Sequence, residues 1–129
     1  MKKIFFALTA FFLLIHASYS LTPDDSTKGA DSVTITVILR ANQDMSTQDI
    51  QQQMLDNGFW KIFPPDYAEV VSWNYAMGVG QIITLKIPLS NITEFNETVQ
   101  TAAWGAYSTE FYITYDYMPV WKDMKGKYR

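Results

Sequence analysis

The chain has 129 residues, a formal net charge of −3 at neutral pH, one histidine and no cysteine. Without cysteine it can form neither a disulfide nor a thiolate metal site, and an acidic chain with no cluster of Lys or Arg argues against nucleic acid as a partner. Because 48% of its residues are apolar, we expect a single domain whose core needs no disulfides.

Residues 1–20 are predicted to be a secretory signal peptide. Two lysines precede the apolar run "IFFALTAFFLLIHA", which is shorter than the roughly 20 residues that span a bilayer. Cleavage after Ser20 would remove Lys2, Lys3 and His16, leaving a histidine-free chain with a net charge near −5. This excludes Ser-His and Cys-His relays and histidine metal sites. We expect a periplasmic or secreted protein with no metal, no cofactor and no stable membrane insertion.

The first elements of the domain follow a polar segment. Residues 21–31 are predicted to be a flexible leader, since they are turn-rich and show no hydrophobic period. "VTITVILRA" then alternates β-branched apolar residues and indicates a strand. "MSTQDIQQQMLDNG" predicts a helix that Ser46 caps, with Asp49 in its first turn and Gly58 at its end.

The middle of the chain predicts a hairpin. "FWKIFPPDYAE" is expected to be a connector, because two consecutive prolines remove donors and favour extended geometry. "VVSWNYAMGVGQIITLKIP" predicts two strands joined at residues 78–80. The glycines there do not fit a phosphate-binding loop, because a strand follows them where such a loop needs a helix.

The C-terminal part predicts a helix and a strand. In "SNITEFNETVQTAAWG" we expect Asn91 to cap a helix that ends at Gly105 and turns an apolar stripe inward, the stripe being Phe95, Val99, Ala102 and Ala103. Trp104 and Tyr107 are expected to pack where this helix turns. "TEFYITYDYMPVW" predicts a strand whose core-facing residues are Phe111, Ile113, Tyr115 and Tyr117. Residues 122–129 are expected to form a polar, frayed tail.

The order strand, helix, strand, strand, helix, strand predicts an α+β domain over residues 32–121. It is the order of the ferredoxin-like βαββαβ fold, a four-stranded antiparallel sheet of order 4-1-3-2 with two helices on one face. The other face would carry polar and charged candidates for a ligand-binding site: Arg40, Lys86, Glu110, Tyr112 and Asp116. In the antiparallel register Arg40 should approach Glu110, and Lys86 should approach Asp116 across Thr34.

Three interpretations of that second face remain open. It is a solvated surface with weak ion pairs, a surface that stacks on a second copy to form a homodimer, or a polar pocket. In a pocket, Arg40 and Lys86 would bind a small anion, and Glu110, Asp116 or Tyr112 would supply proton donors or acceptors.

On element order, residues 33–120 resemble the dimeric α/β-barrel group of ferredoxin-like proteins, which includes muconolactone isomerases and small monooxygenases. No catalytic residue of that group matches a position here. The blocks "VVSWNYAMGVGQ" and "AWGAYSTEFYITYDY" also resemble segments of small exported bacterial proteins of unassigned function. The leading hypothesis is a dimeric binding or interaction module. The alternatives are a histidine-free, cofactor-independent isomerase or oxygenase acting on a small anionic or aromatic substrate, and an adaptor with an exposed patch of Trp60, Phe63 and Trp121.

Overall fold

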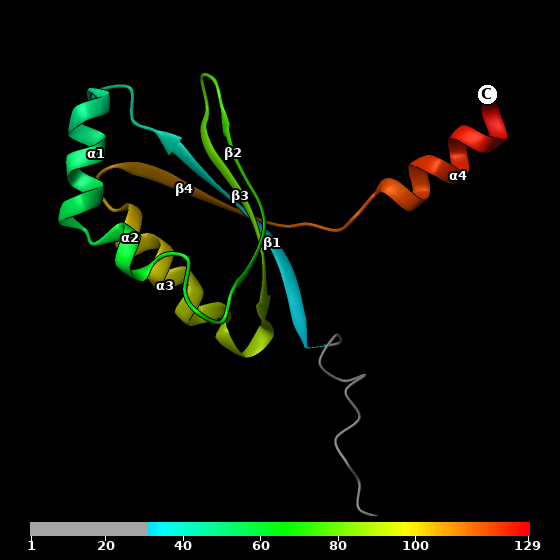
Figure 1. The fold of residues 1–129 in the computed structure, drawn as a ribbon, viewed down its shortest axis with the longest axis horizontal. Coiled ribbons are helices and arrows are strands. Elements are labelled where there is room, and N and C mark those ends of the chain that lie inside the picture. Colours follow the sequence, from blue (N-terminus) through cyan, green and yellow to red (C-terminus); the bar gives the residue numbers. More distant parts are fainter. Residues whose placement is uncertain (1–30) are drawn as a thin grey trace, which may run out of the picture.

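The computed structural model describes residues 31–129, so the predicted signal peptide and nearly all of the predicted leader lie outside the described residues. The domain is α+β, with a four-stranded antiparallel sheet and four helices (Figure 1). In chain order the elements are β1 (Ser32–Ala41), α1 (Thr47–Asp56), α2 (Phe59–Ile62), β2 (Glu69–Ala76), β3 (Gly80–Pro88), α3 (Ile92–Ala103), β4 (Tyr107–Ile113) and α4 (Met118–Tyr128), with one 3₁₀ turn at Leu89–Asn91.

The sheet has the order β2-β3-β1-β4, as the sequence predicts. β1 lies in the centre, pairing with β3 from Ser32↔Pro88 to Arg40↔Gly80 and with β4 from Ile35↔Ile113 to Ala41↔Tyr107. The predicted hairpin of β2 and β3 is confirmed, with a β-bulge between Val70 and Ser72. Side chains therefore alternate between the two faces along every strand except at that bulge.

One face of the sheet is covered by α1, α2 and α3 (Figure 1). The alternation of β1 places Ile35, Val37 and Leu39 on this covered face, and the predicted inward stripe of α3 is confirmed. The most deeply buried large side chains are Phe59, Phe95, Leu39, Ile83, Leu85, Ile87, Val37 and Val99. The core thus lies in a single layer between the sheet and these three helices.

The first helix begins and ends as the sequence predicts. The Ser46 hydroxyl oxygen accepts a hydrogen bond of 3.1 Å from the backbone N–H of Asp49, and Gly58 follows the helix with a φ of 67°. The predicted connector is wrong in one respect, because Gly58 also begins the short helix α2. That turn of helix buries Phe59, and the burial of an aromatic ring explains why a segment just before two prolines is helical.

Gly80 fixes the start of β3 beside β1. Its φ is 133°, and a Cβ at this position would lie 2.1 Å from the backbone oxygen of Leu39. No side chain fits at that distance, so the close approach of the hairpin to β1 requires glycine here.

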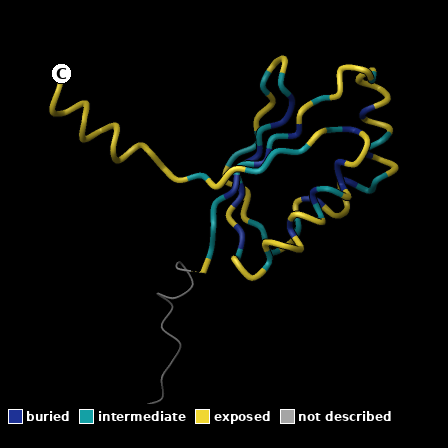
Figure 2. Tube along the Cα trace, turned by 180° about the vertical axis from the view of Figure 1, so that it is seen from behind, coloured by how far each residue is buried: buried dark blue, intermediate teal, exposed yellow. Residues whose placement is uncertain are grey.

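The predicted C-terminal strand is too long, and the predicted tail is wrong. β4 ends at Ile113, and residues 118–128 form α4, which extends away from the rest of the domain beyond the end of β4 (Figures 1 and 2). The reason is local, because an Asp116 side-chain oxygen accepts a hydrogen bond of 2.9 Å from the Met118 N–H, and Pro119 suits the first turn of a helix. Tyr115 and Tyr117, expected in the core, are exposed, as is Ile113.

Three further expectations are corrected. The order of elements is β-α-α-β-β-α-β-α, with α2 and α4 added to the predicted six. Asn91 stands at the start of α3 but makes no capping hydrogen bond, because it belongs to the 3₁₀ turn and its side-chain oxygen accepts from the Ser90 hydroxyl at 3.4 Å, while its amide donates to the Glu94 carboxylate at 3.1 Å. Trp104 is 70% exposed, because it follows the last buried turn of α3.

Among the helices of residues 31–129, none combines the length and hydropathy that crossing a bilayer requires.

Candidate functional site

The face of the sheet opposite α1–α3 is called the open face here. Its central residues come from β1 and β3, which place Thr36 opposite Thr84 and Ile38 opposite Ile82. All four are partly buried by their neighbours on the sheet. The open face therefore combines β-branched apolar side chains with hydroxyl groups, and no helix of the described chain covers it (Figure 1).

A chain of hydrogen bonds crosses the open face from β3 to the residue after β4. The Thr36 hydroxyl lies 3.0 Å from that of Thr84 and 2.6 Å from that of Thr114, and Thr114 donates to the Tyr112 carbonyl at 3.2 Å. A hydroxyl has one proton to donate, so Thr114 must accept from Thr36, and Thr36 must then accept from Thr84. Every proton of this chain is thus used within the protein. These threonines stabilise the sheet and have no donor left for a ligand.

Arg40 and Glu110 form the predicted cross-strand ion pair. The guanidinium Nη2 lies 3.3 Å from one carboxylate oxygen of Glu110 and 3.4 Å from the other. The two side chains are 46% and 34% exposed, so water screens the attraction. An exposed pair with such long contacts contributes on the order of 0–1 kcal/mol to stability.

Lys86 and Asp116 take no part in the ion pair of Arg40 and Glu110. Lys86 lies opposite Thr34 on one side and Glu69 on the other, and it makes no ion pair with any residue of 31–129. The predicted approach of Asp116 to Lys86 is wrong, because β4 ends before Asp116 and its carboxylate instead accepts from the first turn of α4.

Tyr112 lies opposite Thr36 and is exposed. It lines a shallow pocket of about 230 Å³ at the edge of β4, together with Phe95 and Phe111 among others. Arg40, Lys86, Glu110 and Asp116 line neither this pocket nor any other described below. The structure therefore brings Arg40 and Glu110 together and leaves the remaining three candidates apart.

Gln81 is the functional candidate that sequence reasoning missed. It is the one buried polar side chain of the described chain, and it lies on the covered face. The Trp73 indole donates to its side-chain oxygen at 2.7 Å, and its amide nitrogen donates to the Tyr107 hydroxyl at 3.0 Å. The signal was present in the sequence, because Gln81 has the same parity in its strand as Ile83 and Leu85 and so interrupts an apolar face.

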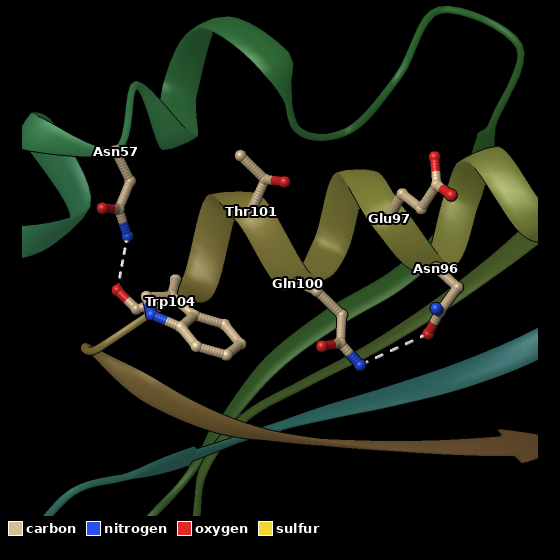
Figure 3. A pocket seen from close by; sticks show the side chains of 6 residues that line it. All are labelled: Asn57, Asn96, Glu97, Gln100, Thr101 and Trp104. Carbon is tan, nitrogen blue, oxygen red and sulfur yellow. Dashed lines mark hydrogen bonds between the residues drawn. The ribbon is translucent and has the colours of Figure 1, made fainter.

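A second concave surface lies at the C-terminal end of α3 (Figure 3). Trp104, Thr101 and Glu97 line a wide, open groove of about 540 Å³. The Asn57 amide donates to the Trp104 carbonyl at 2.7 Å and to the Ala102 carbonyl at 3.1 Å, which fixes the end of α3 to the end of α1. The exposure of Trp104 gives this groove an aromatic wall, but the hydrogen bonds around it serve the helix ends.

The adaptor hypothesis required Trp60, Phe63 and Trp121 to form one exposed patch. Phe63 is buried in the core, Trp60 stacks on Trp73 on the helix side of the sheet, and Trp121 lies on α4. The three side chains therefore do not form one exposed patch.

Within residues 31–129 no group of three or more carboxylate or other ligating side chains is arranged to hold a metal ion.

Comparisons with protein-family models, with curated proteins and with solved structures give no significant match for this chain.

Proposed function

We propose that this protein is an exported interaction module that forms a homodimer through the open face. Its β1, α1, β2, β3, α3 and β4 are interpreted as a ferredoxin-like domain, to which α2 and α4 are additions; the sheet order β2-β3-β1-β4 supports this interpretation. The basic and apolar pattern of residues 1–20 supports export.

The observation that carries the proposal is the uncovered open face. Ile38 and Ile82 lie side by side across β1 and β3, flanked by threonines whose hydroxyl groups already have partners. The centre of this surface loses little by leaving water, because these hydroxyl groups would keep their hydrogen bonds. A second copy offers the same surface, and a twofold axis would stack one open face on the other.

The distribution of charge favours a second copy as the occupant. Residues 31–117 contain ten acidic and three basic residues, whereas residues 118–129 contain four basic residues and one acidic residue. The basic α4 extends away from the domain beyond the end of β4 (Figure 2), where it can reach a partner stacked on the open face. Each basic α4 would then meet an acidic partner domain, and both copies would gain the same contact.

The apolar side of α4 supports the same conclusion. Tyr117, Trp121, Met124 and Tyr128 follow one another at intervals of four, three and four residues, so they share one side of the helix, and all are exposed. A helix shorter than about 12–15 residues is marginally stable in water unless one side packs, and Gly126 weakens this one further. α4 therefore needs a surface to pack on, and residues 31–116 leave its apolar side exposed.

The first experiment measures the molar mass of the protein, expressed with its own N-terminal sequence, by light scattering after size exclusion. We expect a dimer whose N-terminus, read by mass spectrometry, lies near residue 21. Ile82→Lys should give a folded monomer, because two lysines would be buried at the centre of the interface. Leu55→Lys, at an exposed position of α1, is the matched control and should stay dimeric. A monomeric wild-type protein, or a folded Ile82→Lys dimer, would refute the proposal.

A second experiment separates α4 from the open face. Trp121→Ala should weaken the dimer about tenfold or more, since large aromatic side chains dominate interface energies, and Trp104→Ala should not. Dissociation should also rise with salt, because the attraction of α4 to the partner is electrostatic. A salt-independent dimer that tolerates Trp121→Ala would remove α4 from the interface. Binding of a monomeric protein to anionic lipid vesicles would assign α4 to a membrane surface instead.

A further inference from the structure

A pocket of about 440 Å³ lies between the end of β1, α1 and the β2–β3 hairpin. It is on the helix side of the sheet and uses no residue of the open face. Its volume falls within the range of roughly 300–1,000 Å³ that is usual for sites that bind small molecules. Its lining comes from five parts of the chain, so the fold itself forms the pocket and no single loop does.

The hydrogen bonds beneath the pocket have only one consistent direction. An indole N–H can only donate, so the Gln81 oxygen must face Trp73 and the Gln81 amide nitrogen must face Tyr107, as observed. The Tyr107 hydroxyl oxygen is therefore an acceptor toward Gln81. Its own proton is donated to no described residue, and Tyr107 lines the pocket. Gln81 lines it too, with one amide proton beyond the one given to Tyr107. The pocket therefore offers hydrogen-bond donors that no described residue uses.

Two exposed aromatic side chains stand at the pocket. Trp60 and Tyr75 both line it, although 62% and 65% of their surfaces remain exposed. The Trp60 ring stacks on Trp73 with centroids 6.1 Å apart and planes 16° apart, and Trp73 is held in turn by Gln81. The position of Trp60 is thus fixed by the same network that orients Tyr107. Buried Met54 and Ile50 make the inner wall apolar.

No charged residue lines the pocket. Its other polar groups are amides and a hydroxyl, those of Asn42, Gln43, Gln51 and Thr47. Charged residues of both signs flank the lining in the sequence, Arg40 and Lys61 as well as Asp44 and Asp49, but none of them lines the pocket. An anion would lose its hydration here with no cation to replace it, and a cation would find no carboxylate in the lining.

We propose that this pocket binds a small uncharged molecule, with its apolar face against Trp60 and Tyr75 and a hydrogen-bond acceptor at the Tyr107 hydroxyl. A neutral aromatic amide and the apolar face of a neutral sugar share this chemistry. The pocket is separate from the proposed dimer interface. The ligand-binding proposal and the dimer proposal can therefore be refuted independently of each other.

The test is an NMR titration of the full chain that follows the four indole N–H signals. The probes are phenylacetamide, phenylacetate and methyl β-glucoside. A neutral probe should shift the signals of Trp60 and Trp73 and leave those of Trp104 and Trp121 unchanged, with phenylacetate about tenfold or more weaker than the amide. Shifts with phenylacetamide alone identify an aromatic ligand class, and shifts with the glucoside alone identify a sugar. No shift with either neutral probe, or equal binding of phenylacetate and phenylacetamide, overturns the proposal.

Tyr107→Phe tests the hydroxyl while keeping the ring. It should weaken the neutral probe about fivefold, the loss of one neutral hydrogen bond, whereas Tyr112→Phe on the open face should not change binding. Trp60→Ala, whose side chain is mostly exposed, should abolish binding, and Trp104→Ala should leave it intact. Unchanged affinity in folded Tyr107→Phe and Trp60→Ala would overturn the proposal. The dispersion of the remaining indole signals reports folding in each variant.

Discussion

The two faces of one sheet differ mainly in what lies above them. On β1, Val37 and Leu39 are fully buried, while Thr36 and Ile38, which alternate with them along the strand, are only partly buried. All four have β3 and β4 as neighbours in the sheet. The helices α1–α3 cover the first pair and leave the second open (Figure 1). Strand alternation decides which face a side chain takes, and the packing of other elements decides whether that face is buried.

The faces are also stabilised by different interactions. The covered face is held by apolar contacts among aliphatic and aromatic side chains, with the Trp73–Gln81–Tyr107 hydrogen bonds at one end. The open face is held by the threonine hydrogen bonds and by an exposed ion pair. Apolar burial exceeds the other two per residue, so substitutions on the two faces should have effects of different size.

Leu85→Ala on the covered face should cause the largest loss. Leu85 is fully buried, and its truncation leaves a cavity that costs about 2–5 kcal/mol of unfolding free energy. Ile82→Ala, three residues away on the open face, should cost about 1 kcal/mol in the monomer, because part of its side chain already contacts water. Urea denaturation measures both. Equal losses would mean that the open face is as well covered as the core. A loss for Ile82→Ala that grows with protein concentration would show that a second copy covers it.

Thr36→Val should have a smaller effect, of about 1 kcal/mol. The substitution keeps the shape and the strand preference of the side chain but removes the partner of both Thr84 and Thr114. Thr34→Val is the control, because Thr34 lies on the same strand and face and its hydroxyl makes no hydrogen bond to another described residue. Equal stability of the two variants would show that the threonine chain contributes nothing.

The sequence correctly predicted those elements whose apolar residues recur at the spacing of a strand or of a helix, but not at both. The alternation of β1 and the stripe of α3 each match one period, and the antiparallel order follows from them. Residues 114–128 have apolar side chains at both strand and helix intervals, so local spacing could not locate the end of β4. β1 continues to Ser32, three residues beyond its last pair Ile35↔Ile113, so the length of β1 does not end β4. β4 ends because the chain turns into α4, where the Met118 N–H donates to the Asp116 side chain, and apolar spacing does not report this hydrogen bond.

The candidate site was predicted less well than the fold. The predicted strand pairing correctly placed Arg40 beside Glu110, because antiparallel pairing fixes which strand positions meet. It failed for Asp116, whose position depended on a strand that ends earlier. Gln81 was passed over because its role needs Trp73 and Tyr107, which lie 8 and 26 residues away in the chain.

In the monomer, Arg40→Ala should lower the unfolding free energy by less than about 1 kcal/mol, leaving the melting temperature within a few degrees of that of the monomer with Arg40. The pair with Glu110 is exposed and its contacts exceed 3 Å, so high salt should remove most of the difference between the two proteins. Lys61→Ala, an exposed basic residue of α2 with no ion pair in residues 31–129, is the control. A loss above about 2 kcal/mol for Arg40→Ala alone would show that the open face is desolvated, as in a dimer.

Tyr67→Phe on the helix side should have the smallest effect at neutral pH. The Tyr67 hydroxyl is shielded from water, and no hydrogen bond of good geometry reaches it, so its removal leaves no group unpaired and should change stability by less than about 0.5 kcal/mol. Burial raises the pKa of Tyr67, the charge of Glu94 raises it further, and the nearby Thr98 side chain partly offsets both.

The effect of Tyr67→Phe should appear at alkaline pH. Because the folded-state pKa is raised, the folded protein holds this proton more tightly than the unfolded chain, whose tyrosines ionise near pH 10. The stabilisation from keeping Tyr67 neutral is complete below pH 10 and is lost as the pH rises through the raised pKa. The stability of Tyr67→Phe should therefore fall less steeply than that of the wild type above pH 10 in urea denaturation. Tyr115→Phe, at an exposed position between β4 and α4, should follow the wild-type curve, and identical curves for all three proteins would place the Tyr67 hydroxyl in water.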